Sequence, residues 1–160
     1  MRSTLLIIIC LLSLSSTSLS ETLDDLIKID GLYYKELSNV PFNGEVQGQA
    51  QGLFKGGSRA GLWKYYYENG QLRQKGMYTN GKKEGYWESF YRNGQLFYKG
   101  EYKNGKKVGL WESYYDNETL FYKGEYKAGK EEGEWISFNP DGTVWEYKTG
   151  LFKNGHKISD

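Results

Sequence analysis

The chain reads GYWESFYRNGQLFYKGEYKNG from residue 85 to residue 105, and a close copy of this string begins 24 residues later. The Gly-x-Trp triplet recurs at the same step, which places tryptophans at Trp63, Trp87, Trp111 and Trp135. A turn dipeptide recurs with the same 24-residue spacing, at Asn69-Gly70, Asn93-Gly94, Asn117-Glu118 and Asp141-Gly142. A fixed period of this length is typical of repeat proteins, in which each unit packs against its neighbours.

Each unit predicts two strands and two turns. Asn-Gly between short aromatic runs is a strong hairpin signal, because both turn positions accept a positive φ. A second series of turn dipeptides separates the units, at Asn80-Gly81, Asn104-Gly105, Ala128-Gly129 and Asn154-Gly155. The only prolines, Pro41 and Pro140, lie outside the expected strands, as a sheet requires. The predicted fold class is therefore all-β, an elongated antiparallel meander of repeated β-hairpins.

The turn positions also predict a strand register. With Asn93-Gly94 as a two-residue turn, Tyr91 pairs with Leu96, Phe90 with Phe97, Glu88 with Lys99 and Trp87 with Gly100. The same rule sets Trp63 opposite Gly76 and Trp111 opposite Gly124. An indole ring that lies over a glycine covers exposed backbone and stabilises the strand, and Glu opposite Lys is an attractive pair. We therefore expect these tryptophans and glycines to be the structural residues of the repeat.

Alternation along the strands predicts two unlike faces. One face carries Trp87, Ser89 and Tyr98 and is nearly continuous in aromatic rings, so we expect it to be the main packed layer. The opposite face carries an aromatic group near the turn tips, which consists of Phe90, Phe97, Tyr114 and Phe121. An uncovered aromatic patch usually marks an interaction site. These four residues are the candidate binding surface.

The first 20 residues are typical of a secretory signal peptide. A short basic start precedes an apolar run over residues 5–12, and small residues at Ser18 and Ser20 fit cleavage after Ser20. Cys10, the only cysteine, lies in this segment, so the mature chain would hold no thiol. We expect a secreted or periplasmic protein.

The remaining chain divides into three parts. In residues 21–40, Thr22 and Asp25 form a capping box that predicts a short helix to about Lys28, followed by a strand. Residues 41–155 are the repeat domain, and residues 156–160 are a polar tail.

Composition and motifs point away from catalysis and nucleic acids. The chain has 21 basic and 20 acidic residues, and this balance lacks the charge excess that marks nucleic-acid or anionic-membrane binding. His156 is the only histidine and has no cysteine near it to build a zinc site. The carboxylates recur at equivalent places that face lysines. We therefore expect no enzyme activity and no catalytic, cofactor-binding or metal-binding residue.

One family shares this pattern. Gly-x-Trp followed by Asn-Gly, then Lys-Gly-x-Tyr-x-Asn-Gly-Lys, resembles the bacterial variant of the MORN repeat, which occurs in proteins labelled YwqK-family antitoxins. The resemblance covers residues 41–155. It implies an elongated antiparallel sheet of successive hairpins, without a catalytic residue of its own. In eukaryotic relatives such repeats are linked to membrane association, scaffolding and self-association.

The leading functional hypothesis is a secreted scaffold that binds another protein through its aromatic sheet surface. Two alternatives stay open. The resemblance implies an antitoxin or immunity protein of a toxin–antitoxin pair, and aromatic rings that can stack on sugars favour a cell-wall or polysaccharide-binding module. An open terminal strand would also allow pairing with a second copy of the chain.

Overall fold

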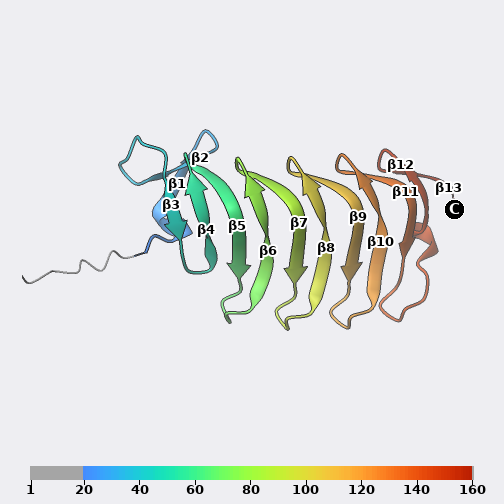
Figure 1. Ribbon diagram of the computed structural model, residues 1–160. Helices are drawn as coiled ribbons and strands as arrows, with labels where there is room; N and C mark the ends of the chain where they lie inside the picture. Colours follow the sequence, from blue (N-terminus) through green and yellow to red (C-terminus); the bar gives the residue numbers. More distant parts are fainter. Residues whose placement is uncertain (1–19, 160) are drawn as a thin grey trace, which may run out of the picture.

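The repeats form one long antiparallel sheet in which every strand pairs with its neighbours in sequence order (Figure 1). The computed structural model describes residues 20–159, so the predicted signal peptide lies outside the described residues except for Ser20. The meander prediction is confirmed. The sheet runs through β3 (Gly44–Val46), β4 (Ala50–Lys55), β5 (Ser58–Tyr66), β6 (Leu72–Thr79), β7 (Lys82–Phe90), β8 (Leu96–Lys103), β9 (Lys106–Tyr114), β10 (Leu120–Lys127), β11 (Lys130–Ser137), β12 (Gly150–Lys153) and β13 (His156–Ser159).

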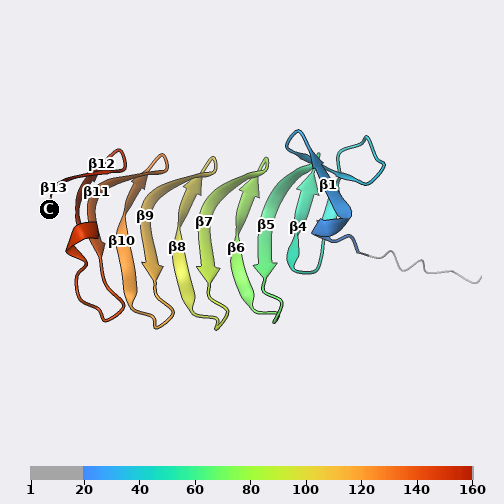
Figure 2. The same ribbon diagram turned by 180° about the vertical axis from the view of Figure 1, so that it is seen from behind.

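The body is elongated along the direction in which strands are added. The view from behind shows the same row of strands, with the first residues of the sheet at one end and β13 at the other (Figure 2). A short 3₁₀ helix, η2 (Glu146–Lys148), lies between β11 and β12. Within residues 20–159, no helix has the length and apolar composition needed to cross a membrane.

The N-terminal segment differs from the predicted helix. Thr22 donates its N–H and its hydroxyl to the Asp25 carboxylate, each at 2.7 Å, but the 3₁₀ helix η1 covers only Leu23–Asp25. The expected extension to Lys28 is wrong, because β1 (Leu26–Ile29) pairs with β2 (Leu32–Lys35) and buries Leu26. The Gln47 N–H donates to the Glu21 carbonyl at 2.8 Å. This segment therefore covers part of the β3 edge.

The expected polar tail is also a strand. Asn154 and Gly155 have φ values of 53° and 85°, and Lys153 pairs with His156 across them. A two-residue turn with positive φ at both positions matches the twist of a hairpin, so residues after it continue the sheet as β13.

The same Asn-Gly dipeptide makes two different turns. Asn80-Gly81 and Asn104-Gly105 have positive φ at both positions, as two-residue hairpin turns require. At Asn93-Gly94 only Gly94 has a positive φ, of 87°. The Tyr91 N–H donates to the Gln95 carbonyl at 2.8 Å, so the loop holds residues 92–94 and is one residue longer than predicted.

A bulge then restores the predicted register. Because of the longer loop, Phe90 pairs with Leu96 instead of Phe97, and the predicted pairs of Phe90 with Phe97 and Tyr91 with Leu96 are wrong. Phe97 is the extra residue on β8. Beyond it, Glu88 pairs with Lys99 and Trp87 with Gly100, as predicted. The extra loop residue and the bulge offset each other, so the register beyond them is the predicted one. The predicted pairs of Trp63 with Gly76 and of Trp111 with Gly124 are also confirmed.

Each indole covers a different glycine from the one we expected. A β-carbon on Gly100 would lie 2.7 Å from Cγ of Trp111 and still nearer to two other ring atoms, so Trp111, not Trp87, lies over Gly100. Trp87 lies over Gly76 in the same way. The reason is the indole N–H, which Trp111 donates to the Glu101 carbonyl at 3.2 Å on the preceding strand. The rings therefore lean toward the strand before them.

The third loop contains a residue with an unfavourable backbone conformation. Glu118 has a φ of 67° at the position where Gly70 and Gly94 stand in the preceding repeats. A side chain in this left-handed region costs about 1–2 kcal/mol. We therefore expect Glu118→Gly to raise the free energy of unfolding by about 1 kcal/mol, allowing for the greater flexibility of glycine when unfolded. Urea denaturation would measure it. Gly94→Glu is the reciprocal control and should destabilise by a similar amount; an unchanged or lower midpoint for Glu118→Gly would contradict the expectation.

Candidate binding surfaces

The tryptophan face is the core of the array. We use this name for the face with Trp63, Trp87, Trp111 and Trp135 and the rings that pack on them. The first three are 0% exposed and Trp135 is 4% exposed. Ring contacts with centroid distances of 4.8–6.1 Å connect one end of the protein to the other, through Tyr33, Phe54, Trp63, Tyr78, Trp87, Tyr102, Trp111, Tyr126, Trp135 and Phe152.

This continuous series, the aromatic spine, has a structural role. Each tryptophan packs its ring against a glycine and donates its N–H to a backbone carbonyl, so no ring face or polar atom of these tryptophans is left for a ligand. Edge-to-face contacts of this kind add to the stability gained by burial. A ligand on this face would meet the half-buried tyrosines and the side chains between them.

The four predicted contact residues do not form one patch. Phe97 lies 4.8 Å from the Tyr91 ring and 5.2 Å from the Tyr98 ring, and Tyr98 in turn contacts Trp111. Phe121 repeats this arrangement with Tyr115 and Tyr122. Neighbouring side chains on a regular strand point to opposite faces, so the bulge is what turns these two rings toward the tryptophan face.

The other two residues lie on the opposite face. Lys75 Nζ is 5.9 Å from the centre of the Phe90 ring, and Lys99 Nζ is 5.9 Å from the centre of the Tyr114 ring. The Tyr114 hydroxyl donates to the Glu112 carboxylate at 3.0 Å. Phe90 and Tyr114 are half-buried against charged neighbours instead of forming a free aromatic surface.

A row of charges crosses this second face, which we call the ladder face. Strand pairing places Lys64, Lys75, Glu88, Lys99, Glu112 and Lys123 side by side on consecutive strands. Lys75 contacts Glu88 at 2.8 Å, and Glu112 contacts Lys99 at 2.8 Å and Lys123 at 3.1 Å. The hydrogen bond from Lys99 is the main reason that the pKa of Glu112 falls to about 2. Lys75, Lys99 and Lys123 therefore each contact a carboxylate, although the ladder holds four lysines and only two glutamates.

Exposed apolar side chains that the sequence analysis missed lie on the same face as the ladder, and the strand pairing places Glu101, Glu125 and Glu134 between them. We call this set the apolar stripe; its members are 38–51% exposed and are Leu62, Met77, Tyr86, Leu110, Ile136 and Leu151. Leu62, Tyr86 and Leu110 are the middle residues of the Gly-x-Trp triplets. The preceding glycines, such as Gly85 with a φ of 65°, lie at bulges that lift these residues outward. The 24-residue step of this middle position was the available signal.

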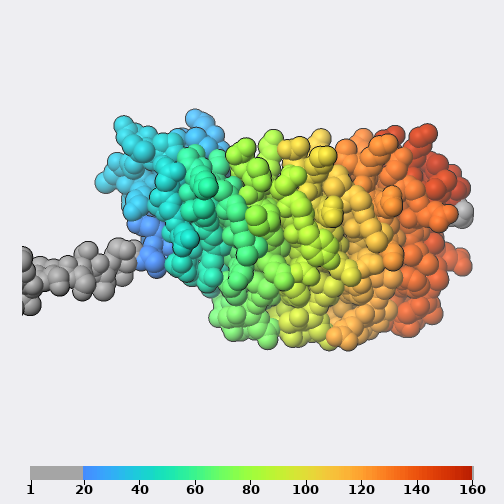
Figure 3. Space-filling model, viewed as in Figure 1, coloured from blue at the N-terminus to red at the C-terminus, as the bar shows by residue number. Residues whose placement is uncertain are grey.

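Shallow hollows accompany the stripe. One hollow of about 430 Å³ is lined by Tyr86 and Leu110 together with Gly100 and Gly109. A larger one of about 790 Å³ connects Leu110, Ile136 and Leu151. The hollows form because the glycines leave the sheet surface bare between large side chains. The space-filling view shows that the successive repeats make one continuous body (Figure 3).

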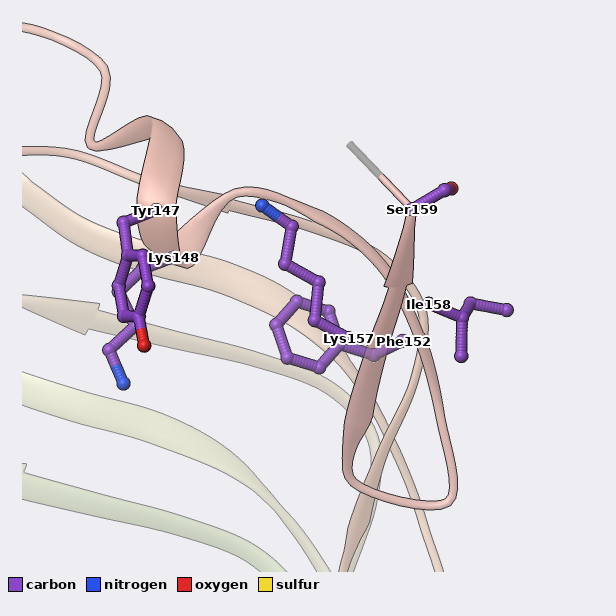
Figure 4. A pocket seen from close by; sticks show the side chains of 6 residues that line it. All are labelled: Tyr147, Lys148, Phe152, Lys157, Ile158 and Ser159. Carbon is purple, nitrogen blue, oxygen red and sulfur yellow. The ribbon is translucent and has the colours of Figure 1, made fainter.

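A further hollow of about 480 Å³ lies at the C-terminal end (Figure 4). Its lining comes from η2, β12 and β13 and comprises Tyr147, Lys148, Phe152, Lys157, Ile158 and Ser159. Lys157 Nζ donates to the Glu146 carbonyl at 3.0 Å. The lining combines amines, rings and a hydroxyl, without a general base beside a nucleophile. Within residues 20–159, no three acidic, histidine or cysteine side chains lie close enough together to hold a metal ion.

The comparison with protein families agrees with this geometry. Residues 59–80, 83–104 and 107–128 match the model of the MORN repeat variant. These three segments are similar to MORN repeats. Each matched MORN segment begins with a basic residue, passes through Gly-x-Trp and the three-residue loop, and ends at the first residue of the next two-residue turn. A comparison with curated proteins finds no match for the chain.

Proposed function

We propose that this protein is a secreted, non-catalytic scaffold whose MORN repeats bind a protein partner through the apolar stripe. The observation that carries the proposal is the stripe itself. Six large side chains stay 38–51% exposed on one face, although the opposite face has rings enough to bury every tryptophan. Large apolar side chains that gather exposed on one face often mark an interaction site, and the glutamates between them add polar contacts.

The surroundings of the stripe indicate what partner fits. The hollows beside Leu110 offer both apolar side chains and carboxylates to a partner, and the Lys–Glu ladder forms a charged border. Interfaces commonly combine such an apolar centre with a polar rim. A partner with a line of apolar anchors and charges of both signs beside them would match.

The test compares two matched variants in partner capture. Leu62→Asp combined with Leu110→Asp should abolish capture of the partner that the wild-type mature chain retains, because each aspartate would need burial in the contact. Leu37→Asp is the control, since Leu37 is fully exposed and lies outside the stripe. If both variants retain the same partner, or neither does, the stripe is not the binding surface. N-terminal sequencing of the exported chain should begin at Glu21.

An antitoxin or immunity role is the alternative that the MORN resemblance favours. In this alternative, the partner that binds the apolar stripe is a toxic protein. Loss of the chain should then inhibit growth, and the Leu62→Asp, Leu110→Asp chain should fail to restore it.

A further inference from the structure

Three cations lie over the rings of the tryptophan face at equivalent positions in successive repeats. Arg59 Cζ is 4.9 Å from the Trp63 ring centre, Lys83 Nζ is 4.0 Å from Trp87, and Lys107 Nζ is 4.2 Å from Trp111. Each also lies near a tyrosine of the spine: Tyr78 at 5.6 Å, Tyr102 at 4.9 Å and Tyr126 at 4.6 Å. We call these three residues the cation row.

The cation row forms no ion pair of the kind that the ladder lysines have, although the Glu131 carboxylate acts on Lys107 and raises its pKa against the larger effect of burial. None of the ion pairs within residues 20–159 includes Arg59, Lys83 or Lys107. Lys83 Nζ donates to the Gln74 side-chain carbonyl at 3.3 Å, and Arg59 Nη2 donates to the Tyr33 hydroxyl at 2.9 Å. Arg59 Nε is buried and has no hydrogen-bond partner. The equivalent residue of the next repeat is Glu131, so the row of cations stops at Lys107.

Holding cations in this way costs free energy. Burial lowers the pKa of Lys83 to about 8 and also lowers the pKa of Lys107, because the rings replace water around each amine. The attraction between each cation and the aromatic faces offsets part of that desolvation free energy. An anionic ligand would offset more of the desolvation free energy, because its charge would interact with three half-buried cations where water screens the interaction weakly. The arrangement is therefore suited to an anion that reaches all three.

The spacing of the row selects among anionic polymers. The three residues lie on β5, β7 and β9, which are alternate strands. Twice the separation of neighbouring strands is about 10 Å. An extended peptide with acidic residues on one side repeats its charge about every 7 Å. One disaccharide of an extended pyranose chain is about as long as the separation of alternate strands, about 10 Å. The half-buried tyrosines between the cations also offer rings and hydroxyls to sugars.

We propose that the tryptophan face binds an extended acidic polysaccharide that carries one carboxylate per disaccharide, with Arg59, Lys83 and Lys107 each meeting one carboxylate. This site lies on the opposite face from the apolar stripe. It can therefore fail or succeed independently of the proposed protein-binding function.

The experiment titrates the mature chain with hyaluronan, which alternates a uronate with a neutral amino sugar, and follows binding by calorimetry and tryptophan fluorescence. Wild type should bind, and its affinity should fall as salt rises. Lys83→Met with Lys107→Met keeps the aliphatic stems but removes both charges, and should weaken binding by at least about tenfold. Lys75→Met with Lys123→Met removes two ladder lysines and should leave affinity within about twofold.

Two further ligands keep the test decisive without any variant. Hyaluronan with its carboxyl groups reduced should not bind, and polyglutamate should bind at least about tenfold more weakly than hyaluronan, because its charges do not match the row. The proposal is overturned if wild type ignores hyaluronan, binds the reduced polymer equally well, or prefers polyglutamate. Equal loss in the two double variants would also overturn it.

Discussion

Trp111→Ala is expected to lower the free energy of unfolding by about 4 kcal/mol, in the usual range for loss of a large buried ring. Trp111 is 0% exposed and contacts Tyr98, Tyr102 and Tyr126 at centroid distances of 5.6, 5.0 and 5.8 Å. Its N–H also donates to the Glu101 and Val108 carbonyls, each at 3.2 Å. Alanine would leave a cavity, interrupt the aromatic spine and remove a hydrogen bond from both carbonyls.

Urea denaturation followed by far-UV circular dichroism measures this loss. Trp145→Ala is the matched control, because Trp145 is half-buried and lies outside the three matched repeats. We expect it to cost about 1 kcal/mol. Similar losses for the two variants would show that the spine does not carry the stability of the array.

Gly100→Ala is expected to cost about 3 kcal/mol, although alanine is otherwise the smallest possible change. The φ of Gly100 is not in the left-handed region, so the backbone itself would accept alanine. The cost arises because the new methyl group would overlap the Trp111 ring, whose Cγ would be only 2.7 Å away. A ring fixed by neighbours on both sides cannot move aside cheaply.

A double-mutant cycle tests which indole covers this glycine. Trp111→Leu removes the ring that Gly100→Ala would hit, so the second change should cost much less in that background, and the coupling should exceed about 1 kcal/mol. Trp87→Leu is the control, because Trp87 pairs with Gly100 but leans over Gly76. Its effect should add to that of Gly100→Ala. The reverse result would restore the arrangement first predicted from the register.

The repeat period and the residue types at its landmarks were sufficient to predict the meander and most of the register. Gly-x-Trp and Lys-Gly at a fixed step leave few ways to pair strands without losing the Trp–Gly and Glu–Lys matches. The type of each turn was not predictable from the dipeptide. Asn93-Gly94 and Asn104-Gly105 have the same letters, but the first belongs to a loop one residue longer. What separates them is the bulge at Phe97, a property of the paired strands together.

The surfaces were harder to predict for the same reason. Simple alternation groups Phe97 with Phe90, but the bulge turns Phe97 toward Tyr98 and the tryptophan face. A second bulge at Gly85 leaves Tyr86 exposed beside a buried Trp87. The register that sets Lys99 opposite Glu88 was predictable, but its ion pair with Glu112 on the next strand was not. The lack of an ion pair at Lys83 likewise depends on which side chains fold over the rings. Local irregularities therefore decided which residues face a ligand.

The Trp–Gly row has a consequence for how the molecule can change in length. Trp87 packs on Gly76, and Gly100, which pairs with Trp87, is covered by Trp111 of the next repeat. The same Trp–Gly contact thus recurs at Gly52, Gly76, Gly100 and Gly124. Duplication or loss of a whole 24-residue unit joins two surfaces that already fit, so an ancestral gene could have grown or shrunk in such steps without passing through a misfolded product.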